Sequence, residues 1–467
     1  MILMVLCIVA TGCTPDDELP LDPLVDSEDP GASAGAPEIP VAGESAAPQP
    51  GASDDPVVPP TPRPRAGRFV LVDLEGASTD RDATDVVLRT ERGLELDRFR
   101  LPGAIGLFAE PGGRWALIRT LDGQWAKLDG VAGTLSLVSF AEDAPTTPPR
   151  LQGPIAYWTD SETPWLLRLD GGDPTDLRGL VGGEVQVDTV SADGQYVLLR
   201  GDGTFLLDTI SLESRRPDPD SRLTLGVDGT VATVFARDGT AVLTVERADG
   251  GDRRDLAELA ALGLPVPLPD GRVLVIGGTS TVVSADGSRT DLPDIPSPAG
   301  TPVVLGLGGT VVLPVAAGLA VINTNTSTVD VIADSQGFTL AAEPLASWGW
   351  AASDDPDAPG LIVINGGDGT ATRLLVDVPT GPVTSMSTDG FRVVVASGEG
   401  VLAVSADGIV LPPAPGAVIS AVMHPTDPLA AATVVDGALS TLQVGELGGP
   451  VIEIAGGRNP AWLKTGT

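Results

Sequence analysis

Residues 184–208 read EVQVDTVSADGQYVLLRGDGTFLLD, and this stretch shows the plan on which most of the chain is built. Short runs of apolar and β-branched residues are separated by Asp-Gly pairs, at Asp193-Gly194 and Asp202-Gly203. Asp-Gly favours a tight hairpin turn, because glycine readily adopts the positive φ angle that such a turn requires. Together with the polar stretch that continues to Ser221, the pattern predicts three or four antiparallel strands.

The same plan recurs about every forty residues from Gly67 to the end of the chain. Each repeat has a turn mark followed at once by a short apolar run, such as QYVLL or RVLVI. The ten marks are Gly67, Gly113, Gly153, Gly194, Gly229, Gly271, Gly309, Gly349, Gly390 and the Asp427-Pro428 turn. A period of this length indicates a repeated four-stranded unit. Such units cannot bury both faces alone, so they pack on their neighbours, either radially in a propeller or linearly in a solenoid.

The two ends of the repeated region favour the propeller. The segment NPAWLKTG, residues 459–466, has the pattern of an innermost strand whose unit is otherwise missing. The segment GRFVLVDLEG, which begins at Gly67, has the pattern of a unit that lacks its innermost strand. Each segment supplies what the other lacks, as the closure of a ring requires, whereas a solenoid would show polar capping repeats at both ends.

We therefore predict an all-β fold in which residues 67–467 form a single large β-propeller of four-stranded blades, closed by strands from its two ends. The marks predict up to ten blades. Eight is the alternative, because propellers usually have about four to eight blades and one or two repeats could be insertions. Helical spacing of apolar residues occurs only in RRDLAELAAL, Arg253 to Leu262, which predicts one or two helical turns in a connection between units.

Several repeats resemble a known family unit. The segments VSADGQYVLL (190–199), MSTDGFRVVVA (386–396) and PAWLKTG (460–466) resemble the P-x-W-S-P-D-G-x-x-hydrophobic repeat of TolB-type and other WD-like propellers. The resemblance covers residues 67–467, and it implies the propeller fold. The proline of the family's Pro-Asp-Gly is kept only at Pro269, so the resemblance transfers no partner.

The N-terminal segment, residues 1–13, predicts export. MILMVLCIVATGC is an apolar run of signal-peptide length that ends in small residues and a cysteine. Ala10-Thr11-Gly12-Cys13 resembles the lipobox of bacterial lipoproteins, which implies that Cys13 carries the lipid anchor. Alanine replaces the usual leucine, and no basic residue precedes the run. The alternative is a truncated signal peptide or a short anchor, with a secreted protein. A spanning helix is not expected, because it needs about 20 apolar residues.

Residues 14–66 have the composition of a tether. They are rich in Pro, Ala, Gly, Ser, Asp and Glu, and no basic residue occurs in them before Arg63. Such a segment cannot bury enough apolar surface to offset its chain entropy, so we expect it to be disordered. Its prolines favour an extended spacer. The sequence thus predicts a bacterial cell-envelope protein, lipid-anchored outside the cytoplasm at the outer membrane or cell surface.

Charge and cysteine content restrict the classes of partner and of chemistry. The formal net charge is −35, so phosphate backbones and anionic lipid surfaces are repelled and nucleic acid is excluded as a partner. Cys7 and Cys13, the only cysteines, both lie in the N-terminal segment, so residues 67–467 have no thiol or disulfide chemistry. The charged pairs Arg215-Arg216 and Arg253-Arg254 fall in polar connections and are predicted to be solvated loop charges.

No catalytic or cofactor motif is found in the repeats. His424 is the only histidine and occupies a position where other repeats carry a turn residue or serine, so we predict a turn-capping role. A two-histidine metal site is impossible. We predict no bound cofactor or metal. Two aspartate clusters could supply oxygen ligands to calcium, but both lack the spacing of a calcium loop and are expected to be solvated hairpin tips. They are Asp354, Asp355 and Asp357, and Asp218 and Asp220.

The sequence favours a non-catalytic, monomeric scaffold that binds an unidentified envelope protein or polymer through loops on a rigid ring. The alternative is a propeller enzyme of lyase or cofactor-dependent dehydrogenase type that uses the ring channel. A degenerate propeller without a ligand is a third possibility. The candidate binding surface is the pair Trp348 and Trp350, because tryptophans beside a turn are common binding anchors. The competing interpretation packs them between blades.

Overall fold

The computed structural model describes residues 69–464 apart from eleven short gaps. The described ranges are 69–76, 84–110, 113–141, 144–158, 163–307, 309–343, 345–353, 360–374, 380–397, 400–412, 417–436 and 439–464. The predictions for residues 1–13, for the tether at 14–66 and for Cys13 lie outside these ranges. So do Asp354, Asp355 and Asp357.

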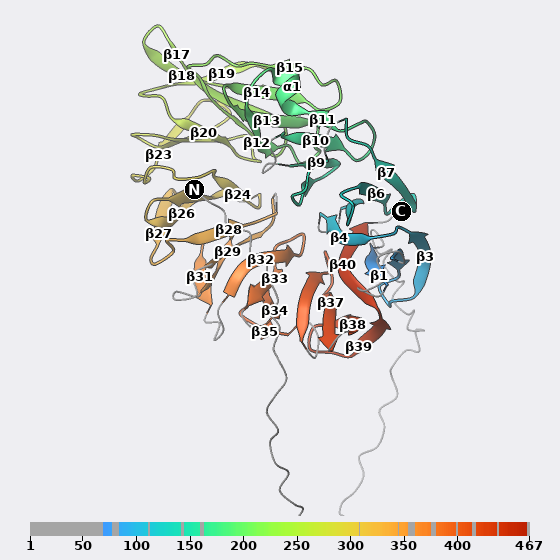
Figure 1. Cartoon of the computed structure of the whole chain (residues 1–467). Helices are drawn as coiled ribbons and strands as arrows, with labels where there is room; N and C mark the ends of the chain where they lie inside the picture. The colour runs from blue at the N-terminus through green and yellow to red at the C-terminus, as the bar shows by residue number, and fades with distance from the viewer. Residues whose placement is uncertain are drawn as a thin grey trace, which may run out of the picture. The chain divides into compact units, whose positions relative to one another are not determined.

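The described residues form ten antiparallel four-stranded sheets that follow one another along the chain and close a ring, which makes the fold a β-propeller (Figure 1). We number the sheets as blades 1 to 10. The chain runs outward through each blade from its first strand to its fourth, except in blade 1, where the first strand is β40.

The first half of the ring contains blades 1 to 5. Their strands are, in blade 1, β40 (Gly457–Lys464), β1 (Phe69–Glu75), β2 (Asp85–Arg89) and β3 (Glu95–Arg100); in blade 2, β4 (Ala104–Ala109), β5 (Trp115–Thr120), β6 (Trp125–Asp129) and β7 (Thr134–Val138); in blade 3, β8 (Arg150–Gln152), β9 (Ile155–Tyr157), β10 (Trp165–Arg168) and β11 (Thr175–Asp176); in blade 4, β12 (Val185–Val190), β13 (Tyr196–Gly201), β14 (Thr204–Asp208) and β15 (Ser214–Arg215); in blade 5, β16 (Arg222–Leu225), β17 (Thr230–Arg237), β18 (Thr240–Arg247) and β19 (Arg254–Leu259).

The second half contains blades 6 to 10. Their strands are, in blade 6, β20 (Leu264–Pro267), β21 (Val273–Ile276), β22 (Thr281–Val283) and β23 (Arg289–Asp291); in blade 7, β24 (Val303–Leu305), β25 (Thr310–Val315), β26 (Gly318–Asn323) and β27 (Thr328–Ile332); in blade 8, β28 (Phe338–Ala341), β29 (Trp348–Ser353), β30 (Leu361–Asn365) and β31 (Ala371–Leu374); in blade 9, β32 (Thr380–Met386), β33 (Arg392–Ser397), β34 (Gly400–Ser405) and β35 (Val410–Leu411); in blade 10, β36 (Val418–Met423), β37 (Leu429–Asp436), β38 (Leu439–Glu446) and β39 (Val451–Ala455).

The sequence marks predicted the second strand of every blade. The apolar runs that follow them coincide with β1, β5, β9, β13, β17, β21, β25, β29, β33 and β37. The prediction of a propeller with up to ten blades is therefore confirmed, and the alternative of eight is wrong. No repeat is an insertion, because each mark opens a strand of its own sheet.

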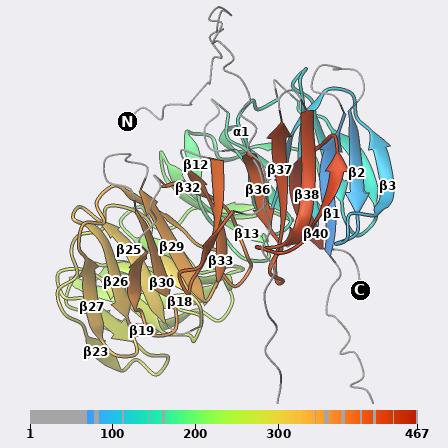
Figure 2. The ribbon, with the colours of Figure 1, turned by 90° about the horizontal axis from the view of Figure 1, so that it is seen from below.

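The ring closes through strands from the two ends of the described chain. In blade 1, β1 pairs antiparallel with β40, and Phe69 lies opposite Lys464. Figure 2 shows β40 and β1 beside β37 and β38 of blade 10. The predicted closure is thereby confirmed, and it removes the two unpaired sheet edges that an open row of repeats would expose.

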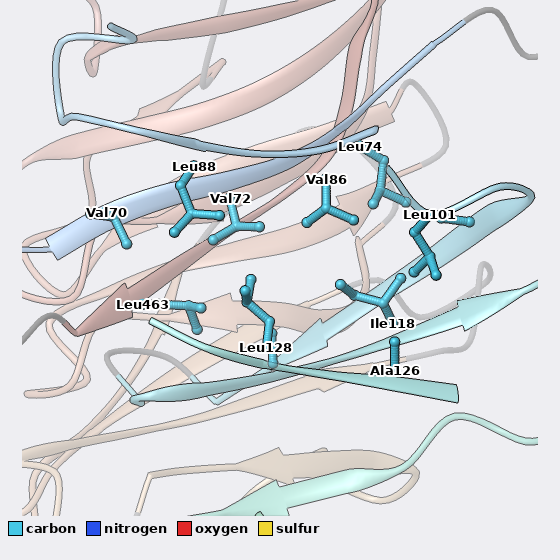
Figure 3. Close-up of a cluster of buried hydrophobic side chains, with 12 residues drawn as sticks. Val70, Val72, Leu74, Val86, Leu88, Leu101, Ile118, Ala126, Leu128 and Leu463 are labelled. Carbon is cyan, nitrogen blue, oxygen red and sulfur yellow. The ribbon is translucent and has the colours of Figure 1, made fainter. Parts of the chain in front are cut away.

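Each pair of neighbouring blades encloses one cluster of buried apolar side chains. Ten such clusters occur among the described residues, one for each of the ten interfaces, including that between blades 10 and 1. Figure 3 shows the cluster of blades 1 and 2, where Val70 and Val72 face Ile118 and Leu128. Each buried Val or Leu stabilises the fold by about 1.5–3 kcal/mol, so the stability of the ring is spread over its interfaces.

The period of two along each strand divides side chains between two interfaces. In β37, Ala430 and Ala432 pack against blade 9, whereas Ala431 between them packs against blade 1. Successive side chains of a strand point to opposite faces of its sheet. Because both faces are covered, the second strands read as continuous apolar runs rather than as alternating ones.

The prediction of helical turns at Arg253–Leu262 is wrong. Residues 254–259 form β19, the outer strand of blade 5, which pairs with β18 through a register shift between Leu243 and Thr244. The shift makes Leu256 an extra residue in β19, and this bulge interrupts the period of two along the strand. The helix that occurs among the described residues is the short α1 (Leu177–Val181), capped by Asp176. No helix in the described ranges combines the length and apolar character that crossing a bilayer requires.

Blade 1 also contains a buried ion pair. Asp73 on β1 is fully buried, and its Oδ1 accepts a hydrogen bond of 2.7 Å from Nε of Arg89 on β2. Arg89 also donates to Oε2 of Glu75 at 2.7 Å. Burial raises the pKa of Asp73 to about 6, against the lowering effect of Arg89. Blade 1, which closes the ring, thus contains a buried carboxylate whose charge is balanced by Arg89.

Candidate functional site

The two faces of the ring carry different loops. The turns between first and second strands, and between third and fourth strands, lie on one face, which we call the hairpin face. The opposite face, here the crossover face, carries the hairpins between second and third strands and the links to the next blade. All polar side chains considered as a site below lie on the hairpin face.

The same serine turn occurs on the hairpin face in blades 4 and 9. In blade 4, Oγ of Ser191 donates to Oδ1 of Asp193 at 2.6 Å and accepts from the amide of Tyr196 at 2.9 Å. Ser387 of blade 9 makes the same two contacts, with Asp389 at 2.7 Å and with the amide of Arg392 at 3.0 Å. These bonds are local and satisfy the turn itself, so the repeated polar residues have a structural role.

His424 of blade 10 replaces this serine. Its amide donates to the carbonyl of Leu429 at 2.8 Å, as the amide of Ser387 does to Arg392 at 2.9 Å. Its Nδ1 accepts from the amides of Asp427 at 2.9 Å and Thr426 at 3.3 Å. The predicted turn-capping role of His424 is confirmed.

The capping bonds fix the protonation state of the imidazole. Because Nδ1 of His424 accepts two amide hydrogens, the proton of the neutral ring is on Nε2. The side chain is only 1% exposed, and it is held between the rings of Phe69 and Trp462, whose centroids are 4.8 and 4.7 Å away. Burial lowers the pKa of His424, against the raising effect of Asp427. His424 is therefore a neutral donor at physiological pH.

Glu91, His424 and Asp427 bring three potential metal-ligand side chains together. Nε2 of His424 is 3.9 Å from Oε1 of Glu91, and Nδ1 is 3.8 Å from Oδ2 of Asp427. A metal needs a nitrogen lone pair, however, and the lone pair of this ring is on Nδ1, where two amides occupy it. In this tautomer Nε2 is a buried N–H donor near Glu91 and has no lone pair to offer a metal.

A cavity of about 860 Å³ lies beside this histidine, between blades 10 and 1. Three hairpin turns enclose it, and they contribute Glu91 and Arg92 from blade 1, and Thr426 to Pro428 and Glu446 to Pro450 from blade 10. Its apolar wall includes Phe69, Leu429 and Ile452. This volume lies in the range of small-molecule and side-chain binding sites.

A second cavity, of about 350 Å³, lies where the innermost strands of blades 1, 2, 8, 9 and 10 meet. Glu110 follows β4 and Glu343 follows β28, and both line it. Burial and the neighbouring charge of Glu110 raise the pKa of Glu343 to about 7. Burial also raises the pKa of Glu110, against the lowering effect of the amide of Gly153, which donates to its Oε2 at 2.8 Å. Two carboxyl groups thus share the channel.

The sequence-predicted tryptophan surface requires a correction. Trp350 is fully buried in the interface of blades 8 and 9, and its Nε1 donates to the carbonyl of Gly390 at 2.6 Å. Because Trp350 is buried, it cannot be an exposed contact for a partner. Its indole ring instead packs between blades 8 and 9. Trp348 is partly buried and meets the ring of Phe391 edge-on at 6.0 Å. Whether Trp348 binds a partner stays a prediction.

The remaining predicted positions have local roles. Oδ1 of Asp218 accepts from the amide of Asp220 at 3.0 Å, which closes an exposed turn. Arg215 pairs with Glu246 at 2.8 Å, and the guanidinium of Arg216 lies over the ring of Phe205 at 5.5 Å. These arginines hold neighbouring strands together at the surface.

Comparison with known proteins identifies no family for this chain. No protein-family model and no curated protein matches the chain. Similar solved structures include a eukaryotic initiation factor, with 11% identity over 85% of this chain and 98% of that one and a TM-score of 0.45. TolB from Acinetobacter baumannii has 16% identity over 60% and 81%, with a TM-score of 0.24. The Cps50 (Swd1) β-propeller domain of Myceliophteria thermophila has 12% identity over 74% and 97%, with a TM-score of 0.32.

With identities and TM-scores this low, the assignment as a propeller rests on the ten sheets themselves. The class that the structure defines is a ten-bladed β-propeller. Its hairpin face carries two cavities lined by acidic side chains.

Proposed function

We propose that this protein is a non-catalytic binding scaffold of the bacterial cell envelope, held by a lipid anchor at Cys13 and a tether at residues 14–66, which docks an envelope protein or polymer through its hairpin face. The observation that carries this proposal is the gathering of non-repeating polar residues on one face. Glu110, Glu343 and His424 stand in turns between first and second strands, Glu91 stands in a turn between third and fourth strands, and each lines a cavity. A rigid ring presents such groups without losing conformational entropy on binding.

The chemistry of the hairpin face supports binding more than catalysis. His424 is the only histidine of the chain, and its Nδ1 already serves two backbone amides, so it is not free to act as a general base. We expect a monomer that binds no nucleic acid, because the net charge of −35 repels phosphate.

One observation favours an enzyme as the second candidate. Glu343, with a pKa of about 7, beside Glu110 is the kind of pair that general acid and base chemistry uses. The described residues that line this cavity, however, include no Lys, Arg, His or Tyr that could position a substrate or stabilise an anion. Turnover of a sugar or peptide substrate by the purified ring, lost in Glu343→Gln, would establish the enzyme.

The scaffold is tested by capture from envelope extract with variants of the two faces. The hairpin-face variant is Glu91→Gln with Asp427→Asn. The control is Asp238→Asn, which removes an exposed charge from the β17–β18 hairpin on the crossover face. We expect the wild type and the control to retain the same partner and the hairpin-face variant to lose it. Equal capture by all three proteins would contradict docking through this cavity.

A further inference from the structure

The cavity between blades 10 and 1 has an unequal distribution of charge. Glu91, Asp427 and Glu446 contribute carboxylates from three different turns, and Arg92 is the only basic residue among the described residues that line it. Three carboxylates and one guanidinium leave two negative charges. A cationic group that enters would therefore be attracted, and an anion would be repelled.

The wall beneath these charges is apolar. Phe69, Leu429 and Ile452 line it, and the side chain of Ile452 is 45% exposed although it is large and apolar. Lysine and arginine bury their methylene stems along such surfaces and keep the charged head at a polar rim. An apolar wall below an acidic rim therefore matches a long basic side chain better than it matches a small hydrophilic cation.

The imidazole of His424 lies next to one of the three carboxylates, that of Glu91. Its Nε2 is buried, makes no hydrogen bond within the described residues, and lies 3.9 Å from Oε1 of Glu91. Nδ1 cannot be protonated without the loss of two turn bonds. The imidazole of His424 is therefore a buried neighbour of the Glu91 carboxylate, and its Nε2–H senses what binds there.

We propose that this cavity binds a lysine or arginine side chain of a partner protein, with the stem on Phe69, Leu429 and Ile452 and the charged head between Glu91, Asp427 and Glu446. The inference rests on the proposed scaffold function and names its partner as a basic protein segment. Charge complementarity supports this choice, because a ring with a net charge of −35 steers basic proteins towards itself and repels acidic ones.

The sole histidine provides a direct test. In protein labelled with ¹⁵N-histidine, every imidazole signal belongs to His424, and a ligand at Glu91 must perturb its Nε2–H resonance. The probe is the capped tripeptide acetyl-glycyl-lysyl-glycinamide. In the control tripeptide, norleucine replaces lysine and removes the positive charge. Free cadaverine keeps the amine and the methylene stem but lacks the peptide backbone. An N-acetylglucosamine oligomer represents the envelope polymer as the alternative ligand.

We expect a saturable shift with the lysine peptide, and about tenfold weaker binding in Glu91→Gln, because one charge-assisted contact is lost. Asp238→Asn should bind as the wild type does. Equal binding of the norleucine peptide, of cadaverine or of the sugar would overturn the proposal, and so would no shift with any probe. If the lysine peptide fails while Glu91→Gln with Asp427→Asn still loses the envelope partner, this inference is wrong and the scaffold stands. If the lysine peptide does not bind and the double variant still retains the envelope partner, both the inference and the proposed scaffold function are wrong.

Discussion

Phe69 and Lys464 lie opposite each other in the ladder between β1 and β40, although they stand at opposite ends of the described chain. This pairing supports both interfaces of blade 1, since Trp462 of β40 belongs to the cluster with blade 10 and Leu463 to the cluster with blade 2. The ring therefore behaves as one cooperative unit only while β40 is in place.

Deletion of residues 459–467 should open the ring. It removes most of β40, exposes the edge of β1, and leaves the clusters of blade 1 without Trp462 and Leu463. We expect a lower Tm and aggregation, measured by calorimetry and light scattering. Lys464→Ala, which keeps the strand, is the control. A truncated protein that unfolds at the wild-type temperature would show that closure contributes nothing to stability.

Arg89→Met should destabilise the protein by about 3–5 kcal/mol at pH 8, because it leaves the carboxylate of Asp73 buried without its partner. Asp73→Asn added to Arg89→Met should restore part of the loss. Arg98→Met, which breaks more exposed ion pairs in the same blade, is the control and should change stability by about 1 kcal/mol or less. Denaturant titrations of all four proteins give the comparison, and equal losses in the two arginine variants would contradict it.

Stability should decrease as the pH rises from about 4.5 to 8. The folded-state pKa values of Asp73 and Glu343, about 6 and about 7, lie above their ordinary values, so the folded state binds more protons than the unfolded state in this window. Glu343→Gln should therefore stabilise the protein at pH 8, by an amount on the order of 2 kcal/mol, and change little at pH 4.5. Denaturant midpoints at the two pH values measure this, and a uniform effect of the substitution would refute it.

Gly390→Ala should destabilise the protein more than Gly271→Ala. Both glycines have positive φ angles, +73° and +82°, so alanine is strained at either position. At Gly390 a Cβ atom would also lie 2.2 Å from the carbonyl oxygen of Trp348, whereas nothing lies within 4 Å at Gly271. The strain alone corresponds to about 1–2 kcal/mol. A similar fall in Tm for both variants would mean that the contact between blades 8 and 9 relaxes freely.

Cys13→Ala tests the anchor. If Cys13 is lipidated, its replacement should release or mislocalise the protein while the ring stays folded, because Cys13 lies outside residues 69–464, the span that holds the ten blades. Fractionation of cells and the circular dichroism of the released protein check the two parts. Membrane association that Cys13→Ala leaves unchanged would refute the lipid anchor.

The sequence predicts the ring because the signals for its strands are local. A turn mark followed by an apolar run specifies the second strand in all ten blades, and the mark is a glycine in every blade except blade 10, where it is Asp427-Pro428. Outer strands lack this signal, since one of their faces meets solvent, and so Arg254–Leu259 could be read as helical. The burial of Trp350 depends on how far blades 8 and 9 stand apart, which no pattern within either blade records.

The candidate site is predicted only in part. His424 could be placed at a turn, because it interrupts a repeated serine position. Its neighbour Glu91 lies in another blade at the far end of the chain, and only ring closure brings the two together. The same is true of Glu110 and Glu343, which belong to blades 2 and 8. Residues that meet across a ring have no sequence spacing in common.

The antiparallel pairing of Phe69 with Lys464 also determines how the ring responds to mechanical force. A pull on the chain ahead of Phe69 loads the ladder at one end, so the pairs with β40 separate one after another, in the manner of a zipper, rather than shearing together. Blade 1 would then be the first to yield under tension, and Phe69, which lines the acidic cavity, would move before any other wall residue. Phe69 thus belongs both to the ladder that closes the ring and to the wall of the acidic cavity.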